Sequence, residues 1–189
     1  MVSLWPVQVA SWQIECCGTP PSVGDVVEWQ LSWLSPQPES DFAVREVTFM
    51  EATALPRSGA VVADSGVVLQ AGALAAWWDG GTVRTAPFQL RGYLVEDHHG
   101  SVPDNLPTTR GVVRQIDVAT CAYRREFAGG RSWVPVPGSE RLRPVRKSPK
   151  WFRHDLPRDD TTAAGELETG LLIMLDVADR EVDADEQRV

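Results

Sequence analysis

Apolar and polar residues alternate with a period of two along much of the chain, a pattern that predicts extended strands rather than helices. The clearest example is the segment of residues 26–34. If this segment is extended, one side of it carries Val27, Trp29, Leu31 and Trp33, and the other carries mainly polar residues. We therefore expect a half-buried strand here.

Residues 7–15 show the same alternation, with Ala10, Trp12 and Ile14 on the apolar side. The sequence thus predicts two strands joined by the connection from Cys16 to Asp25. This connection is rich in Gly, Pro, Ser and Asp and is longer than a tight hairpin. Because long connections in compact domains are often functional, we expect this loop to take part in binding.

Further strands are expected wherever short apolar segments lie between Gly- and Pro-rich turns. These segments are residues 44–51, 60–70, 82–96, 111–123, 132–136 and 171–178. Residues 72–78 are rich in alanine and are compatible with one short helix or with the end of a strand. The pattern predicts an all-β fold, a small partly open β-barrel, because closure removes exposed strand edges.

A long proline-rich segment interrupts this strand pattern before the last strand. Five prolines lie between Pro135 and Pro157, so residues 135–158 are expected to form an extended basic arm inserted into the barrel. We expect residues 1–178 to form a single β-barrel domain that includes this arm. Residues 179–189 are polar and acidic and are expected to be a disordered tail.

Size and composition limit the class of protein. The chain has 189 residues, of which 43% are hydrophobic and 23% are charged, which is typical of one globular domain. Its apolar runs are shorter than the roughly 18 residues that span a bilayer, and its start lacks the features of a secretory signal. Three cysteines, two of them adjacent, suit no disulfide framework. These features predict a cytoplasmic protein that does not enter the membrane.

Charge is strongly segregated along the chain. Residues 1–109 hold four basic and twelve acidic side chains, residues 110–158 hold twelve basic and four acidic, and residues 159–189 hold two basic and ten acidic. The whole chain has a net charge of −8. A basic block therefore lies between two acidic ones.

The basic arm is the main candidate for a binding surface, because it combines cations with aromatic rings that have no obvious place in a core. Its candidate contact residues are Arg143, Arg146, Lys147, Lys150, Trp151, Phe152 and Arg153. Trp151 is the expected anchor, since it is flanked by cations in a segment without strand periodicity. A protein partner is favoured over single-stranded nucleic acid, because the overall acidic field opposes a polyanion. In the competing interpretation, the acidic flanks fold back and neutralise the block, or its aromatic residues only anchor the arm to the barrel.

Thiols and imidazoles offer a third possibility, a zinc- or thiol-dependent enzyme. The candidate ligands are Cys16, Cys17, Cys121, His98 and His99. Their spacing argues against a metal site, because adjacent side chains on a strand diverge, whereas zinc ligands usually lie two to four residues apart. Asp97 and a histidine could also activate a cysteine, yet no catalytic motif accompanies them. We therefore expect a non-catalytic module without a cofactor.

Four segments resemble a known family. They are WQIECCGTPPSVGDVVEW at residues 12–29, GYLVEDHHG at residues 92–100, PTTRGVVRQI at residues 107–116 and ETGLLIMLDV at residues 168–177. Together they are similar to a family of uncharacterised actinomycete proteins known only as a domain of unknown function. The resemblance spans most of the chain and implies a bacterial cytoplasmic protein. It assigns no activity, cofactor or site residue.

Overall fold

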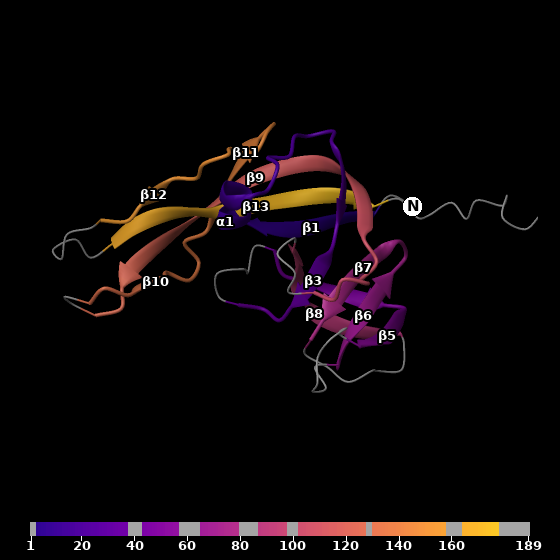
Figure 1. Cartoon of the computed structure of the whole chain (residues 1–189). Coiled ribbons are helices and arrows are strands. Elements are labelled where there is room, and N and C mark those ends of the chain that lie inside the picture. The colour runs from indigo at the N-terminus through magenta and orange to yellow at the C-terminus, as the bar shows by residue number, and fades with distance from the viewer. Residues whose placement is uncertain are drawn as a thin grey trace, which may run out of the picture.

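The computed structural model describes residues 3–37, 43–56, 65–79, 87–97, 102–127, 130–157 and 164–177. Apart from the six-residue helix α1, its regular elements are strands (Figure 1). The helix and the first six strands are β1 (Ser3–Ala10), α1 (Ser11–Cys16), β2 (Val26–Trp29), β3 (Leu31–Leu34), β4 (Arg45–Phe49), β5 (Glu51–Pro56) and β6 (Ser65–Ala71). The others are β7 (Leu74–Trp78), β8 (Phe88–Glu96), β9 (Thr109–Arg125), β10 (Trp133–Pro135), β11 (Arg141–Val145), β12 (His154–Asp155) and β13 (Ala164–Val177).

Two long antiparallel strands, β9 and β13, form the spine of the molecule, and Figure 1 shows them running side by side. The second edge of β9 is covered in turn by β2, β11 and β10. The second edge of β13 is covered by β1 and then by β12. Covering both edges in this way leaves few unpaired backbone groups along the spine.

The sheet continues from β1 through β8, β3, β7 and β6 to β5, and β4 pairs with β8. It curves into a partly open barrel, as the sequence predicts. A side chain joins β7 back to β9 at one end. The buried Thr109 hydroxyl accepts a hydrogen bond from the Ala75 amide at 2.9 Å and donates one to the Ala75 carbonyl at 3.0 Å. The Thr109 side chain thus connects β9 to β7 through hydrogen bonds of the kind that backbone groups form between paired strands.

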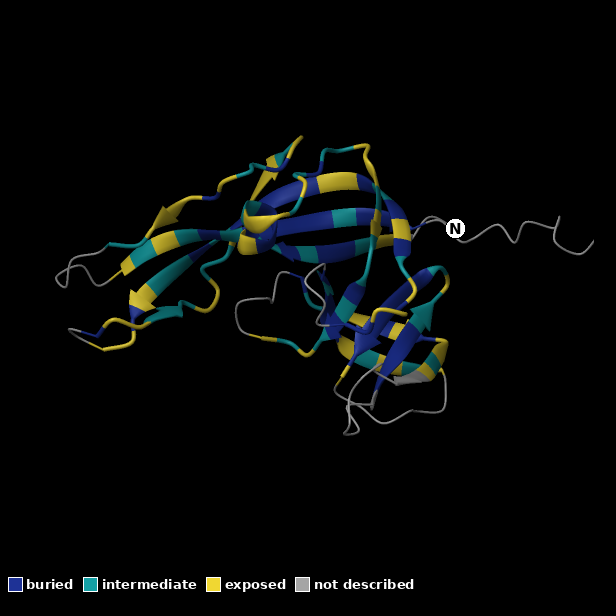
Figure 2. Cartoon of the chain, viewed as in Figure 1, coloured by how far each residue is buried: buried dark blue, intermediate teal, exposed yellow. Residues whose placement is uncertain are grey.

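The core lies inside this curved sheet, and Figure 2 shows buried positions concentrated along β1, β7, β9 and β13. The half of β13 that pairs with both β9 and β1 is almost continuously apolar and buried. In β2 and β3 the predicted alternation is confirmed, because Leu31 and Trp33 are buried while their neighbours are less so. The segment divides into two strands at Gln30.

The prediction of a strand throughout residues 7–15 is wrong, because β1 ends at Ala10 and α1 follows. Pairing with β13 stops at Ala10, which is opposite Gly170. The Gln13 side chain then accepts a hydrogen bond from the Ala10 amide and donates one to the Glu96 carbonyl. These bonds turn the chain into a helix, so Trp12 lies on the surface with 53% of its area exposed instead of in the core.

The alternative of a short helix in residues 72–78 is also wrong. Leu74 to Trp78 form β7, which is buried along its whole length between β6 and β3. Burial on both faces removes the alternation that would have indicated a strand. Strand β5 was not expected at all, whereas the strand expected at residues 171–178 begins earlier, at Ala164.

The proline-rich segment is inserted before the last strand, as expected, and it is extended. It is nevertheless part of the sheet, because β11 pairs with β9 and β12 pairs with β13. The acidic segment of residues 179–189 lies outside the described residues. In the part of the chain that the structure describes, no helix has the length and apolar character needed to cross a membrane.

Candidate binding surface

The structure brings together the two segments that the sequence nominates for binding, the loop of residues 16–25 and the basic arm. Backbone hydrogen bonds join them directly. The Val23 amide donates to the Arg146 carbonyl at 2.9 Å, and the Ser148 amide donates to the Pro21 carbonyl at 2.8 Å. Ser148 is buried at this junction. The arm is therefore fixed to the loop rather than projecting into solvent.

Lys150 extends this attachment to the end of α1. Its Nζ atom lies 2.5 Å from the Ile14 carbonyl oxygen and 3.4 Å from that of Gly18. The last carbonyl groups of a helix have no partner within the helix, and a cation there also interacts favourably with the helix dipole. Lys150 thus serves an internal role and covers the C-terminal end of α1.

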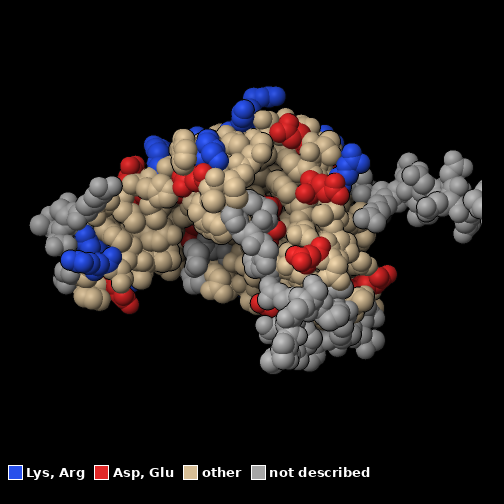
Figure 3. All heavy atoms as spheres, in the orientation of Figure 1, with Lys and Arg blue, Asp and Glu red and all other residues tan. Residues whose placement is uncertain are grey.

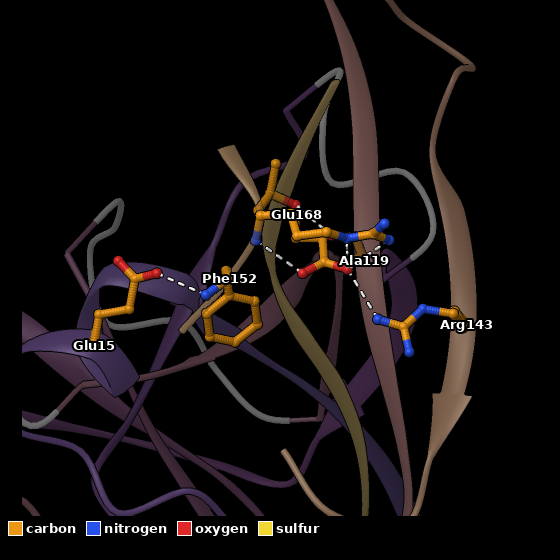
Figure 4. A network of polar contacts seen from close by, with 7 residues as sticks. Glu15, Ala119, Arg143, Phe152 and Glu168 are labelled. Atoms are coloured by element: carbon orange, nitrogen blue, oxygen red, sulfur yellow. Dashed lines mark hydrogen bonds and ion pairs between the residues drawn. The ribbon is translucent and has the colours of Figure 1, made fainter. Parts of the chain in front are cut away.

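Phe152 anchors the arm in the barrel. Its side chain is 6% exposed and belongs to the main hydrophobic core. On either side of the ring, consecutive amide groups of the arm bind two carboxylates, as Figure 4 shows. The Phe152 amide donates to Glu15 at 2.8 Å, and the Arg153 amide donates to Glu168 at 2.9 Å. Phe152 is therefore a core residue and not one of the exposed contacts that the sequence led us to expect.

Glu168 binds two cations of the arm, Arg143 and Arg153. Its side chain is only 4% exposed and accepts a hydrogen bond from Arg143 at 2.9 Å and two from the Arg153 guanidinium at 3.1 Å. Arg143 reaches it from β11, and Arg153 reaches it from the segment that precedes β12. A buried carboxylate is stable only when charged or polar partners replace its lost hydration. Glu168 therefore ties both segments of the arm to the spine.

These contacts shift the acidity of both carboxyl groups. Burial alone would raise the pKa of Glu168, but the hydrogen bonds from the Arg153 backbone, Arg143 and the Arg153 side chain outweigh it and lower the pKa. The pKa of Glu15 is lowered mainly by the hydrogen bond from the Phe152 amide, with smaller contributions from His154 and Lys150. Both groups are therefore held in the ionised form that keeps the arm in place.

Replacing Glu168 with glutamine is expected to lower the free energy of unfolding by about 1 to 3 kcal/mol at neutral pH. Because folding lowers the pKa of Glu168, its stabilisation is fully present above the ordinary glutamate value of 4.5 and disappears as pH falls through the folded pKa. The difference between wild type and Glu168→Gln should therefore shrink on acidification. Urea unfolding at a series of pH values measures this difference.

Glu166→Gln is the matched control, since Glu166 lies on the same strand and pairs with the exposed Arg141. An ion pair between two half-exposed side chains contributes little, so this change is expected to stay within about 0.5 kcal/mol of wild type. Equal effects of the two substitutions at neutral pH would contradict the special role of Glu168.

The same strand neutralises other cations of the basic block. Asp176 on β13 pairs with Arg114 at 2.6 Å, and Glu166 pairs with Arg141. The acidic residues that follow the basic block in the sequence thus fold back onto it, because β13 lies antiparallel to β9. This arrangement confirms the interpretation of internal neutralisation for these cations.

Among the candidate contact residues, Arg146, Lys147 and Trp151 are exposed and are not among those that bind Glu168 or the end of α1. Trp151 is 70% exposed, with the Lys150 ammonium 5.7 Å from its ring centroid. Arg146 and Lys147 are exposed, and neither takes part in an ion pair among the described residues. In the view of Figure 3, basic side chains lie along the upper edge and the left end of the molecule. Acidic side chains are more frequent over the barrel in that view.

The three candidate cysteine ligands do not come together at one place. Cys16 and Cys17 are exposed at the end of α1, whereas Cys121 is buried in β9 with its thiol 3.4 Å from the Ser139 hydroxyl. His98 and His99 lie outside the described residues. Within the described part of the chain, no three His, Cys, Asp or Glu side chains are grouped so that they could hold a metal ion.

Sequence reasoning missed Glu15, Glu168 and an open pocket beside the loop. The pocket has a volume of about 560 Å³ and is lined by the loop, β2 and Glu96. A signal for Glu168 was present, since Glu166 and Glu168 alternate with apolar residues at the start of β13. Their partners could not be found in this way, because the arginines are 15 or more residues away in sequence.

Comparison with known proteins matches the chain to the model of a family. The model of a family of unknown function (DUF6578) matches residues 3–177, which extend from β1 to the end of β13. No curated protein and no solved structure matches the chain.

Proposed function

We propose that this chain, which belongs to the family of unknown function DUF6578, is a non-catalytic binding module that recognises an acidic segment of a partner protein. The proposed surface, named here the arm surface, consists of Arg146, Lys147 and Trp151. Backbone hydrogen bonds join the arm to the loop of residues 16–25 on either side of Lys147.

The exposure of Trp151 carries this proposal. Its two neighbours are fixed, since Lys150 binds the end of α1 and Phe152 lies in the core. The indole is nevertheless 70% exposed. A large apolar side chain on a rigid backbone loses little conformational entropy on binding, and tryptophan is among the residues that most often dominate interface energies.

Charge favours an acidic partner. Arg146 and Lys147 lie within five residues of Trp151, and in the described part of the chain neither is used in an ion pair. Cations around an apolar anchor speed association with acidic partners and select against basic ones. Single-stranded nucleic acid is less favoured, because Arg143, Arg153 and Lys150 are already bound to groups of the protein itself.

Peptide display with the full chain as bait tests the proposal, with counter-selection on Trp151→Ala. We expect the enriched peptides to be rich in Asp and Glu. Loss of a central tryptophan typically costs about 2 kcal/mol or more, so these peptides should bind Trp151→Ala about 30-fold or more weakly. Fluorescence anisotropy with synthetic peptides gives both affinities.

Phe127→Ala is the control, because Phe127 is another exposed aromatic residue but follows the end of β9 and is not part of the arm. It should leave peptide affinity within about twofold of wild type. Enriched peptides that bind wild type and Trp151→Ala equally would overturn the proposal. Salt-sensitive binding of a single-stranded oligothymidylate that disappears in Trp151→Ala, without acidic peptides, would replace it with nucleic-acid binding.

We also propose that the protein acts in the bacterial cytoplasm. All three cysteines are free thiols, two of them exposed, which suits a reducing compartment. Alkylation of intact cells and of purified reduced protein should then modify the exposed cysteines to the same extent.

A further inference from the structure

Cys16 and Cys17 form an adjacent pair of exposed thiols at the point where α1 ends. Because the two residues are consecutive and both are exposed, small solutes can reach both thiols at one place on the surface. Cys17 also lines the open pocket beside the loop, so small solutes can reach it. The third cysteine, Cys121, is 2% exposed and bound within the spine.

The backbone around this pair is closely tied to the arm. The Gln13 carbonyl accepts hydrogen bonds from the Cys17 amide at 3.4 Å and from the Gly18 amide at 2.8 Å. Lys150 in turn donates to the carbonyls of Ile14 and Gly18. A rotation of the peptide between Cys16 and Cys17 would disturb the hydrogen bond from the Cys17 amide to the Gln13 carbonyl.

We propose that Cys16 and Cys17 are a redox modification site, at which a small disulfide of the glutathione type converts the two thiols into a vicinal disulfide. This inference does not depend on the proposed partner, because it concerns only the two thiols and the backbone that carries them.

The reaction proceeds by two exchanges. The thiolate of one cysteine attacks the disulfide of the oxidant, so one glutathione thiol leaves and a mixed disulfide remains on that cysteine. The other cysteine then loses its proton and attacks the cysteine sulfur of the mixed disulfide, which releases the second glutathione thiol. The two hydrogens lost by the protein appear on the two released thiols, and the oxidant is reduced.

Either thiol can make the first attack, and both orders give the same vicinal disulfide, because each cysteine lies next to the mixed disulfide formed on the other. Desolvation and the hydrogen bond to Cys16 raise the pKa of the Cys17 thiol, although Lys150 acts in the opposite direction.

The product is expected to be easy to reduce. Adjacent Cα atoms are about 3.8 Å apart across a trans peptide, whereas relaxed disulfides join Cα atoms about 4.4 to 6.8 Å apart. Ring closure therefore strains the bond and its backbone, and strained, exposed disulfides are the labile and regulatory ones. The ring encloses the Cys16–Cys17 peptide, so its strain is expected to loosen the hydrogen bond from the Cys17 amide to the Gln13 carbonyl.

Intact-mass spectrometry of the folded full chain, incubated with mixtures of reduced and oxidised glutathione, tests the inference. We expect wild type to lose two hydrogens without keeping glutathione, and its three titratable thiols to fall to one. Cys17→Ser should instead retain one glutathione on Cys16. Cys121→Ser should behave like wild type in mass, which excludes a disulfide to Cys121.

Other outcomes would overturn the inference. The first is that wild type accumulates the glutathione adduct as much as Cys17→Ser does. The second is that wild type forms disulfide-linked dimers between chains. The third is that wild type keeps all three thiols under conditions in which Cys17→Ser is modified. Hydrogen exchange supplies a second measurement. The amides of Cys17 and Gly18 should exchange faster in the oxidised protein and return to the original rate after reduction.

Discussion

Replacing Gly170 with alanine is expected to lower the free energy of unfolding by about 3 to 5 kcal/mol, a large part of the stability of a domain this size. Gly170 has a φ of +150°, a backbone conformation that L residues rarely adopt. A Cβ atom there would collide with the Val9 carbonyl oxygen and would lie only 3.0 Å from the Ala10 Cα and the Ser11 amide nitrogen. These are backbone atoms, which cannot move aside as a flexible side chain can.

The position explains why a glycine is needed. Gly170 follows an irregularity in the pairing of β13 with β9, after Glu168, and it lies opposite Ala10, where β1 ends and α1 begins. The spine therefore bends at the point where its second edge passes from β1 to β12. A Cβ atom would force β1 and β13 apart at this point.

Gly138→Ala separates collision from backbone conformation. Gly138 has a φ of +75°, but a Cβ atom there would meet nothing within 4 Å. Only the conformational cost applies, so the expected loss is about 1 to 2 kcal/mol. Urea unfolding followed by tryptophan fluorescence compares both variants with wild type. If Gly170→Ala proved as stable as Gly138→Ala, the close approach of β1 and β13 would be refuted.

Phe152→Ala is expected to lower the free energy of unfolding by about 3 kcal/mol, because it leaves a cavity in the main core. The change should also release the arm. The amides of Phe152 and Arg153, which now bind Glu15 and Glu168, are expected to exchange with solvent much faster. Urea unfolding and hydrogen exchange measure the two effects.

Trp151→Ala is the neighbouring control for stability. Its side chain is mostly in solvent, so its removal should change the free energy of unfolding by no more than about 0.5 kcal/mol. Adjacent aromatic residues would then have opposite roles, Phe152 in stability and Trp151 in binding. Equal destabilisation by both substitutions would show that the indole also packs against the barrel.

Phe152 is buried in the core and Trp151 faces solvent, so the arm is anchored and at the same time presents an exposed side chain. Phe152, Glu15 and Glu168 hold the backbone, so that Trp151 keeps its place before any partner arrives. A rigid arm needs no ordering when it binds, and this lowers the entropic cost of association. The same attachment binds Arg143 and Arg153 to Glu168 and Lys150 to carbonyl groups, which limits the attraction of the arm for polyanions.

The all-β fold could be predicted because its signal is local. In residues 26–34, side chains alternate between core and solvent, and this period is written into the order of the residues. The signal was misleading at residues 11–16. There, Gln13 forms hydrogen bonds with the Ala10 amide and the Glu96 carbonyl, and the distant partner cannot be found from local order. The alternating pattern was absent at β7, because both faces of this strand are buried.

The candidate binding surface likewise has one feature that local sequence predicts and one that distant contacts decide. The exposure of Trp151 could be anticipated, because no apolar periodicity surrounds it. Phe152 has the same local composition, yet it lies in the core. Its position depends on Glu15 on one side and Glu168 on the other, which come from opposite ends of the chain.

The sequence by itself determined the strand-rich fold, the position of the insertion before the last strand and the segregation of charge, because each depends on the order and type of neighbouring residues. Only the tertiary structure decided which of the cations are neutralised and which aromatic residue faces solvent. Both depend on the pairing of β13 with β9, which brings acidic residues late in the chain beside the basic arm. Such pairing is set by packing between distant segments, and no local pattern encodes it.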